Sequence, residues 1–463
     1  MQDEFGNPLE VSLDRAPRRD AQSANEPSDS GTISRLVIGL LLLNLISAAL
    51  FIGLVNRPVY DEPYNIFDVH NYATRGLSME TLLSHRNPPG PTGFLWMAAG
   101  VRLLSGSELR DARIAVLLSW ILLAAGILAG ARSTRFPQLW FGALLALLVF
   151  PHAVEAAATL LTEGPSLLFA VLGILAWIEF VSRPTFTPGV LVLGLLGGLS
   201  MGLAVTCRQY NLALLSAAAL YALCQLPKCA PGERWRWSAT VGLSLALAAL
   251  PVLLMVLVWK GISSPGMTTG TSYDHMWTAT VGLNLSRPIV VAFYSALYLV
   301  PLTFPAMFRL KTFQRRVALL FAVLGGAGIT YFSSLFLQPG PLKSFIRMAS
   351  RLPHGGTLLF GILAAVVLYN AAAVCSLLWE QRTSLSSSAP AVFALLVVVF
   401  FVAEQIGVGG NLPFYDRYIL QLAPFLGLIA FTILPRLTPS RLFAIACLSA
   451  FSHFMLWRFA FGG

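Results

Sequence analysis

The residues of this chain that could do chemistry stand where long apolar runs end. The first of them, Asp61 and Glu62, are adjacent and follow shortly after the uncharged run 36–55. A carboxylate held at such a boundary loses part of its hydration, which raises its basicity and suits it to take a proton from a hydroxyl group. We expect Asp61 to be a general base. We expect Glu62 to orient Asp61 or to bind hydroxyl groups of a substrate.

A second group of polar residues lies further along the chain. Glu163, in "LTEGPSLL", directly precedes an apolar run; it could be a second catalytic acid or bind an acceptor, or it could simply stabilise the N-terminus of a helix. Arg208 separates two apolar runs, with Gln209 and Asn211 beside it. An arginine so close to hydrocarbon is costly unless it is paired, so this group is expected to bind an anionic substrate. The alternative is that Arg208 reaches out to lipid head groups.

Cations near the C-terminus form two further candidates. Arg417, in "YDRY", could bind a phosphate group or pair with its neighbour Asp416. Lys343, Arg347 and His354 lie in "PLKSFIRMASRLPHGG", a basic segment that could meet a pyrophosphate acceptor or anionic lipid head groups.

These residue types suit the transfer of a sugar from a lipid phosphate. Such a reaction needs a base for the acceptor hydroxyl and cations for the departing phosphate. Because the donor carries its own leaving group, no cofactor is required. The sequence shows no paired-histidine or CxxC spacing for zinc. The sequence leaves open whether Asp61 and Glu62 bind a divalent ion.

The composition indicates what must position these residues. The chain has 463 residues, of which 56% are hydrophobic and only 11% are charged, with a mean hydropathy of +0.72. A chain so poor in charge cannot cover a water-exposed surface. Its net charge of +10 does not indicate nucleic acid, because the arginines stand between hydrophobic runs rather than in a soluble basic domain. The fold class is therefore an all-α polytopic membrane protein.

The apolar runs predict about thirteen transmembrane helices, since about 20 apolar residues cross a bilayer. The apolar segment 93–105 is short and predicts an interfacial or re-entrant helix in a long first outer loop. Residues 1–33, with seven acids and three bases, read as a disordered tail, which leaves 34–463 as one membrane domain. The predicted spans are 35–55, 110–131, 137–156, 165–182, 188–206, 210–226, 238–259, 288–308, 317–337, 357–379, 390–408, 417–434 and 440–458.

Loop arginines predict the orientation, because cytoplasmic loops are enriched in basic residues. With a cytoplasmic N-terminus, the inner loops include "RLKTFQRR", which has four basic residues among eight. The segments 56–109, 260–287 and 338–356 then face outward. The third of these is itself basic, so either the helix count slips there or its cations bind something anionic.

Six segments, taken in order, resemble the dolichyl-phosphate-glucose α-1,2-glucosyltransferase family, within the polytopic GT-C class of glycosyltransferases. The resemblance lies in an acidic stretch after the first span, a Pro-Gly segment, an arginine-led span, a Thr-Glu stretch, an Arg-Gln-x-Asn motif and a late Arg-Tyr motif. These are "DEPYNIFDVHNY" (61–72), "NPPGPTGFL" (87–95), "ARIAVLLS" (112–119), "FPHAVEAAATLLTEGPSLLF" (150–169), "CRQYNL" (207–212) and "YDRYIL" (415–420).

The resemblance implies a GT-C-like, inverting enzyme that moves a hexose, glucose in that family, from a polyprenyl or dolichyl phosphate to a lipid-linked glycan. The chain departs from the family at Asn65, where the family has histidine, and at Tyr210, where it has threonine. These departures concern the substrate more than the reaction.

Three alternatives remain at this stage. The first is a related transferase with a protein or lipid acceptor, the second a lipid or solute transporter, and the third a non-catalytic scaffold. A transporter would place ionisable groups near the middle of its spans. The expected location is the plasma (inner) membrane of a bacterium or the endoplasmic reticulum membrane of a eukaryote.

Overall fold

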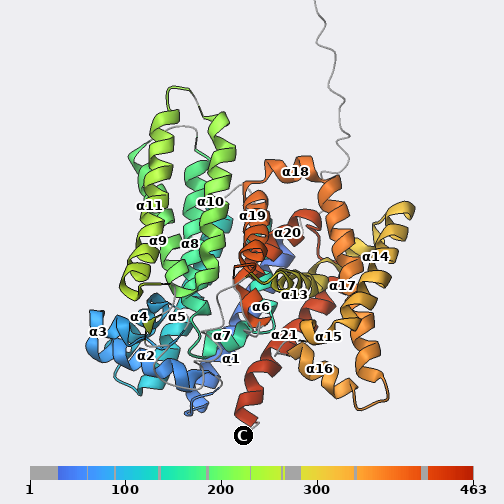
Figure 1. Cartoon of the computed structure of the whole chain (residues 1–463), viewed down its shortest axis with the longest axis horizontal. Coiled ribbons are helices and arrows are strands. Elements are labelled where there is room, and N and C mark those ends of the chain that lie inside the picture. The colour runs from blue at the N-terminus through green and yellow to red at the C-terminus, as the bar shows by residue number, and fades with distance from the viewer. Residues whose placement is uncertain are drawn as a thin grey trace, which may run out of the picture.

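In a computed structural model of the protein, every secondary-structure element among the described residues is a helix (Figure 1). The described residues are 30–59, 61–87, 90–133, 137–183, 187–229, 231–261, 264–265, 283–337, 341–407 and 416–461. Most of the expected N-terminal tail lies outside them. Helix α1 begins at Ser30, within the segment expected to be tail.

The helices follow one another with short connections over most of the chain. Their bounds are α1 Ser30–Leu54, α2 Glu62–Arg75, α3 Met79–Leu83, α4 Pro91–Leu103, α5 Glu108–Ser133, α6 Pro137–Val149, α7 Ala153–Ala158, α8 Glu163–Val181, α9 Pro188–Cys207, η2 Gln209–Asn211, α10 Leu212–Gln225, η3 Leu226–Lys228, α11 Arg234–Trp259, α13 Ser286–Thr303, η5 Phe304–Phe308, α14 Thr312–Tyr331, α15 Ser333–Phe336, α16 Pro341–Ala349, α17 Gly355–Glu380, α18 Arg382–Ser387, α19 Ala389–Glu404, η6 Asp416–Leu422, α20 Ala423–Ile433 and α21 Pro439–Phe461.

The polytopic membrane class is confirmed. Among the described residues, nine helices are long and apolar enough to cross a bilayer. Large side chains such as Leu43, Leu257 and Leu324 are exposed on α1, α11 and α14. Exposed apolar side chains at this density would be a liability in water, and a lipid bilayer covers them.

The predicted spans differ from the structure mainly in length. The span predicted at 137–156 is a shorter helix, α6, followed by a turn and α7. The span predicted at 417–434 begins as the 3-10 helix η6 and continues as α20. Helix α14 is not among the nine, and its first turns carry Arg315 and Arg316. The short helix expected at 93–105 is α4.

The helices pack in neighbouring sets. Helix α9 packs between α8 and α11, α20 packs on α6, and α14 packs on α17. The close approach of α9 to α11 requires glycine, because a Cβ at Gly198 would lie 2.1 Å from the carbonyl oxygen of Ser244. This small-residue packing is typical of membrane helices, whose backbones approach closely.

The two ends of the bundle separate as the loop arginines predict. Figure 1 shows α2, α3, α4, α7 and α16 at one end and α18 at the other. Lys311 pairs with Glu380 at 3.0 Å, which puts "RLKTFQRR" at the α18 end. Helix α16 lies at the α2 end, so the helix count does not slip at the basic segment 338–356.

Candidate active site

Four of the candidate residues meet in one place. Arg417 Nη2 donates to Asp61 Oδ2 at 2.5 Å, and Arg208 Nη2 donates to Glu163 Oε1 at 2.6 Å. Arg417 Nε lies 4.0 Å from the same Glu163 oxygen, which joins the two pairs. We call Asp61, Glu163, Arg208 and Arg417 the ion-pair cluster. It unites the first loop, the start of α8, the α9–α10 junction and η6.

Helix ends place these side chains. Asp61 is the N-cap of α2, but its side chain makes no capping bond; its carbonyl accepts from the amides of Tyr64 and Asn65 instead. The carboxylate is therefore available to Arg417. Glu163 is the first residue of α8, where a negative charge also favours the helix N-terminus. The expectation that Glu163 stabilises a helix start and the expectation that it belongs to a site are thus compatible.

Arg208 stands at a break between two helices. Its backbone is extended, with φ −146° and ψ 117°, between the end of α9 and η2. The break is held by Asn211, whose Nδ2 donates to the carbonyls of Ala204 and Arg208 and to Ser166 Oγ. Asn211 thus fixes the backbone of Arg208 rather than facing outward. Gln209, between them, is half-buried.

The four side chains differ in their access to water. The Asp61 side chain is 36% exposed, whereas those of Glu163 and Arg417 are 1% and 8% exposed. Burial alone lowers the pKa of Arg208, but the Glu163 carboxylate, with Tyr210 and Tyr418, raises that pKa above its ordinary value. The Arg208 guanidinium is therefore held as a cation. Asp61 is the member of the cluster that water and a substrate hydroxyl reach most readily.

Oε2 of Glu163 and Nε of Arg208 are buried and have no hydrogen-bond partner among the described residues. Buried polar groups in proteins are nearly always satisfied. Atoms of this kind inside a charged cluster are consistent with a site that binds another polar group.

Two tyrosines that were not expected to take part border the cluster. Tyr210 Oη accepts from Arg208 Nη1 at 3.2 Å, and its ring lies 5.2 Å from that of Tyr418. Arg208 lies over the rings of both tyrosines, and Arg417 lies over that of Tyr418. Tyr210 is next to Gln209 in "CRQYNL", and Tyr418 is next to Arg417 in "YDRYIL". This adjacency is the sequence signal that could have identified the two tyrosines.

Glu62 does not point to the cluster, although it is the neighbour of Asp61. Its carboxylate is buried, pairs with Arg113 Nη2 at 2.5 Å and accepts from the amides of Val59 and Leu160. Asn65, the position at which the chain departs from the family motif, donates to the carbonyl of Leu160. The start of α2 is thus tied to the segment that leads to Glu163.

The Pro-Gly segment and the start of α4 pack against the residues that lie just before Arg208 and Glu163 in the chain. A Cβ at Gly90 would lie 2.1 Å from the carbonyl oxygen of Thr206, and one at Gly93 would lie 2.7 Å from Cγ2 of Thr162. Thr162 immediately precedes Glu163. The absence of side chains at these two glycines therefore lets the first loop pack directly on the segments that carry the pair.

The rest of the first loop is fixed by a second buried group. Asp68 accepts from the amides of Arg86 and Asn87, and His85 stacks on Trp259 of α11 with ring centroids 5.6 Å apart. Burial and the nearby Asp68 charge raise the pKa of Tyr72, which lies beside His85. These contacts make the first loop a rigid support for Asp61.

Lys343, Arg347 and His354 are not brought to the cluster. Lys343 and Arg347 are exposed on α16, and His354 is exposed at the start of α17. No hydrogen bond or ion pair links them to the cluster within the described residues. Helix α16 buries Leu342 and Ile346 and turns its basic side chains outward, an arrangement typical of an interfacial helix.

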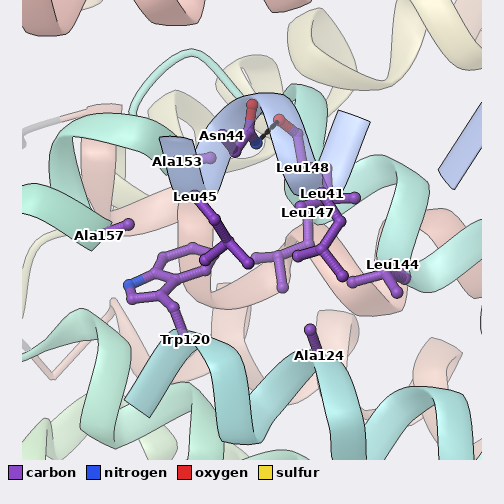
Figure 2. A pocket seen from close by; sticks show the side chains of 10 residues that line it. All are labelled: Leu41, Asn44, Leu45, Trp120, Ala124, Leu144, Leu147, Leu148, Ala153 and Ala157. Carbon is purple, nitrogen blue, oxygen red and sulfur yellow. Dashed lines mark hydrogen bonds between the residues drawn. The ribbon is translucent and has the colours of Figure 1, made fainter. Parts of the chain in front are cut away.

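The described residues show no metal centre at the cluster, and the small pocket that lies between four of the helices is elsewhere. In the described parts of the chain, no group of three His, Cys, Asp or Glu residues could hold a metal ion. Figure 2 shows a small apolar pocket between α1, α5, α6 and α7, lined by residues such as Leu45 and Trp120. Its polar residue, Asn44, donates to the carbonyl of Leu148 at 2.8 Å. No member of the ion-pair cluster lines this pocket.

The comparisons with known proteins give similarities of helix arrangement. No protein-family model and no curated protein matches the sequence. The structure is similar to that of ArnT from Cupriavidus metallidurans in the apo state, with 15% identity and a TM-score of 0.38 over 92% of this chain and 78% of that one. ArnT bound to undecaprenyl phosphate gives 16% identity and a TM-score of 0.40, over 90% of this chain and 78% of that one.

A third similar structure is the arabinosyltransferase EmbB from Mycobacterium smegmatis, with 13% identity and a TM-score of 0.33. The match covers 98% of this chain and 44% of EmbB. At identities and TM-scores this low, these similarities carry no conclusion about the activity of this chain.

Proposed function

We propose that the protein is an integral-membrane glycosyltransferase that moves a hexose from a polyprenyl or dolichyl phosphate to the hydroxyl group of an acceptor. The observation that carries this proposal is the ion-pair cluster itself. It places one partly exposed carboxylate beside two buried guanidinium groups, at the end of a helical bundle that lipid surrounds. A reaction between a lipid phosphate and a water-soluble hydroxyl needs these groups at such a boundary.

Asp61 is the general base in this proposal. It takes the proton from the acceptor hydroxyl as the acceptor oxygen attacks the anomeric carbon of the donor. Its side chain is 36% exposed, which suits this role better than the burial of Glu163, whose side chain is 1% exposed. General-base catalysis contributes about 100- to 10,000-fold in rate.

Arg208 and Arg417 receive the phosphate that leaves. The bond between the anomeric carbon and the phosphate oxygen breaks, and the electron pair remains on that oxygen. A guanidinium group can bind two phosphate oxygens at once and lies in surroundings of low polarity, where its charge acts strongly. Glu163 holds Arg208 in place, and the half-buried Gln209 is assigned to the sugar.

Glu62 and Asn211 are positioning residues. Glu62 joins the N-terminus of α2 to Arg113 of α5 and to Leu160, in the segment before Glu163. Asn211 donates to the backbone carbonyl of Arg208. The lipid chain of the donor lies among the membrane helices. Lys343, Arg347 and His354 bind anionic lipid head groups, or the phosphates of a lipid-linked acceptor, at the membrane surface.

The finer assignments follow from the resemblance of the motifs. They are glucose as the sugar, a lipid-linked glycan as the acceptor, inversion at the anomeric carbon, and the outer or lumenal face as the place of reaction. The N-terminus would then be cytoplasmic. A related transferase with a protein or lipid acceptor would need the same cluster.

The direct test is to reconstitute the purified protein in liposomes with polyprenyl-phosphate glucose, mannose and aminoarabinose, each with and without candidate acceptors. Transfer or release of sugar with at least one donor supports the proposal. A lack of reaction with all donors, together with movement of solute or lipid across the membrane, would favour a transporter.

A further inference from the structure

The hydrogen bond between Asp61 and Arg417 conflicts with the roles proposed for these two residues. Asp61 must accept a proton, yet its Oδ2 lies 2.5 Å from Arg417 Nη2. While Arg417 donates to Oδ2, that oxygen is not open to the proton of an acceptor hydroxyl. Arg417, for its part, must bind the phosphate of the donor. In the observed arrangement each of the two side chains is engaged by the other.

We propose that Arg417 is exchanged between Asp61 and the donor phosphate, so that binding of the donor is what frees the base. This inference rests on the proposed function. The phosphate takes the place of the Asp61 carboxylate on Arg417. Asp61 is then released at the moment at which a sugar is present to be transferred. Without a donor the base remains paired with Arg417.

The geometry favours Asp61, rather than Glu163, as the carboxylate that gives way. Glu163 is 1% exposed and held by Arg208, so removing it would leave a buried cation unpaired. The Asp61 side chain is 36% exposed, so water can solvate its carboxylate when it leaves Arg417.

The Asp61 side chain can also move without loss of local structure. It makes no capping bond to α2, whose first turn is bonded to the Asp61 carbonyl. Glu62 holds the same turn through Arg113 and Leu160. Rotation of the carboxylate away from Arg417 therefore leaves the helix intact.

When Arg417 turns to the phosphate, it stays near a second negative charge. Its Nε lies 4.0 Å from Glu163 Oε1, so the guanidinium is partly anchored on the buried side of the cluster. The exchange thus needs a change at one end of the guanidinium group rather than removal of the whole side chain.

If Asp61 competes with the donor phosphate for Arg417, removing the Asp61 charge should strengthen phosphate binding. A pair that serves only the structure would not have this effect. Asp61→Asn removes the charge that competes for Arg417. We expect undecaprenyl phosphate to bind the variant roughly 2- to 10-fold more tightly, as for loss of one competing, partly exposed ion pair. Binding is measured by titration of the purified protein in nanodiscs. Undecaprenol, which lacks the phosphate, should bind both proteins equally.

Two further variants make the result specific. Glu80→Gln removes an exposed acid of the same loop that pairs with Arg75, so it controls for the loss of negative charge and should not change the affinity. In an Arg417→Gln background, Asp61→Asn should have no effect on the affinity. Asp61→Ala serves the same purpose if the asparagine variant does not fold.

The outcomes separate the exchange from the function. Equal or weaker binding of undecaprenyl phosphate by Asp61→Asn would overturn the exchange while leaving the function standing, as would tightening that persists without Arg417. If the wild-type protein does not distinguish undecaprenyl phosphate from undecaprenol, the proposed function fails and the exchange fails with it.

Discussion

Arg417 donates a hydrogen bond to Asp61 although 356 positions separate the two residues. The contact joins the loop after the first helix to the segment before α20, so residues from distant parts of the chain form one site. Between them, Glu163 and Arg208 form a second pair that is almost entirely buried. Each of the following predictions tests one part of this arrangement.

Arg208→Lys should weaken use of the donor. Lysine keeps the charge but lacks the planar fork that can bind two oxygens of a phosphate while holding Glu163. We expect kcat/KM for the donor to fall about 10- to 100-fold, as for loss of a charged hydrogen bond. Steady-state kinetics would show this, with Arg183→Lys, an exposed arginine at the end of α8, as the matched control. An unchanged kcat/KM would mean that Arg208 serves only the structure.

Glu62→Gln should act on stability rather than on chemistry. The substitution leaves Arg113 buried without its carboxylate, and breaking such a pair costs about 3–5 kcal/mol. We expect a clearly lower thermal midpoint in detergent. Arg113→Gln should have a similar effect, and the double variant should be less destabilised than the sum of the two. A stable Glu62→Gln variant with a greatly reduced kcat would instead return Glu62 to the catalytic groups.

The two ends of the bundle should differ in access from outside. In a cysteine-free background, Met79→Cys at the α2 end should react with an impermeant maleimide on intact cells. Thr312→Cys, at the start of α14, should react only after the membrane is opened. Both positions are exposed, so burial does not bias the comparison. The reverse pattern would place the ion-pair cluster on the cytoplasmic side and contradict the proposed orientation.

Removal of divalent metal ions should leave the reaction unchanged. The proposed mechanism uses two guanidinium groups for the departing phosphate and requires no metal. Transfer measured in excess EDTA should therefore stay within about 2-fold of the untreated rate, less than the loss from a single oxyanion contact. Loss of activity in EDTA that Mg²⁺ or Mn²⁺ restores would show that a metal ion shares the work of Arg208 and Arg417.

The sequence singled out four polar residues that meet in the structure but did not indicate how they pair. Polar residues at the ends of apolar runs are costly, so Asp61, Glu163, Arg208 and Arg417 could be singled out. Which acid meets which arginine depends on how distant helices pack, and single-sequence patterns do not contain that information. Arg417 was considered with its neighbour Asp416, whereas in the structure it binds Asp61.

The neighbours Asp61 and Glu62 show why adjacency in sequence is a poor guide to shared function. Successive residues of a helix point about 100° apart. Asp61 therefore meets Arg417, while Glu62 turns to Arg113. Lys343, Arg347 and His354 were expected to meet an acceptor pyrophosphate or lipid head groups. Their exposed positions on α16 and at the start of α17 fit either partner, and the sequence pattern does not distinguish the two.

The most direct test of the proposed mechanism is the rate of sugar transfer by Asp61→Asn, compared with the wild type on the polyprenyl-phosphate sugar that the donor panel identifies. Asparagine keeps the size of the side chain but cannot accept the proton. We expect kcat to fall about 100- to 10,000-fold while the protein still folds and binds the donor phosphate. A variant that stays within a few-fold of wild type, while Glu163→Gln abolishes transfer, would place the base at the start of α8 and contradict the assignment of Asp61.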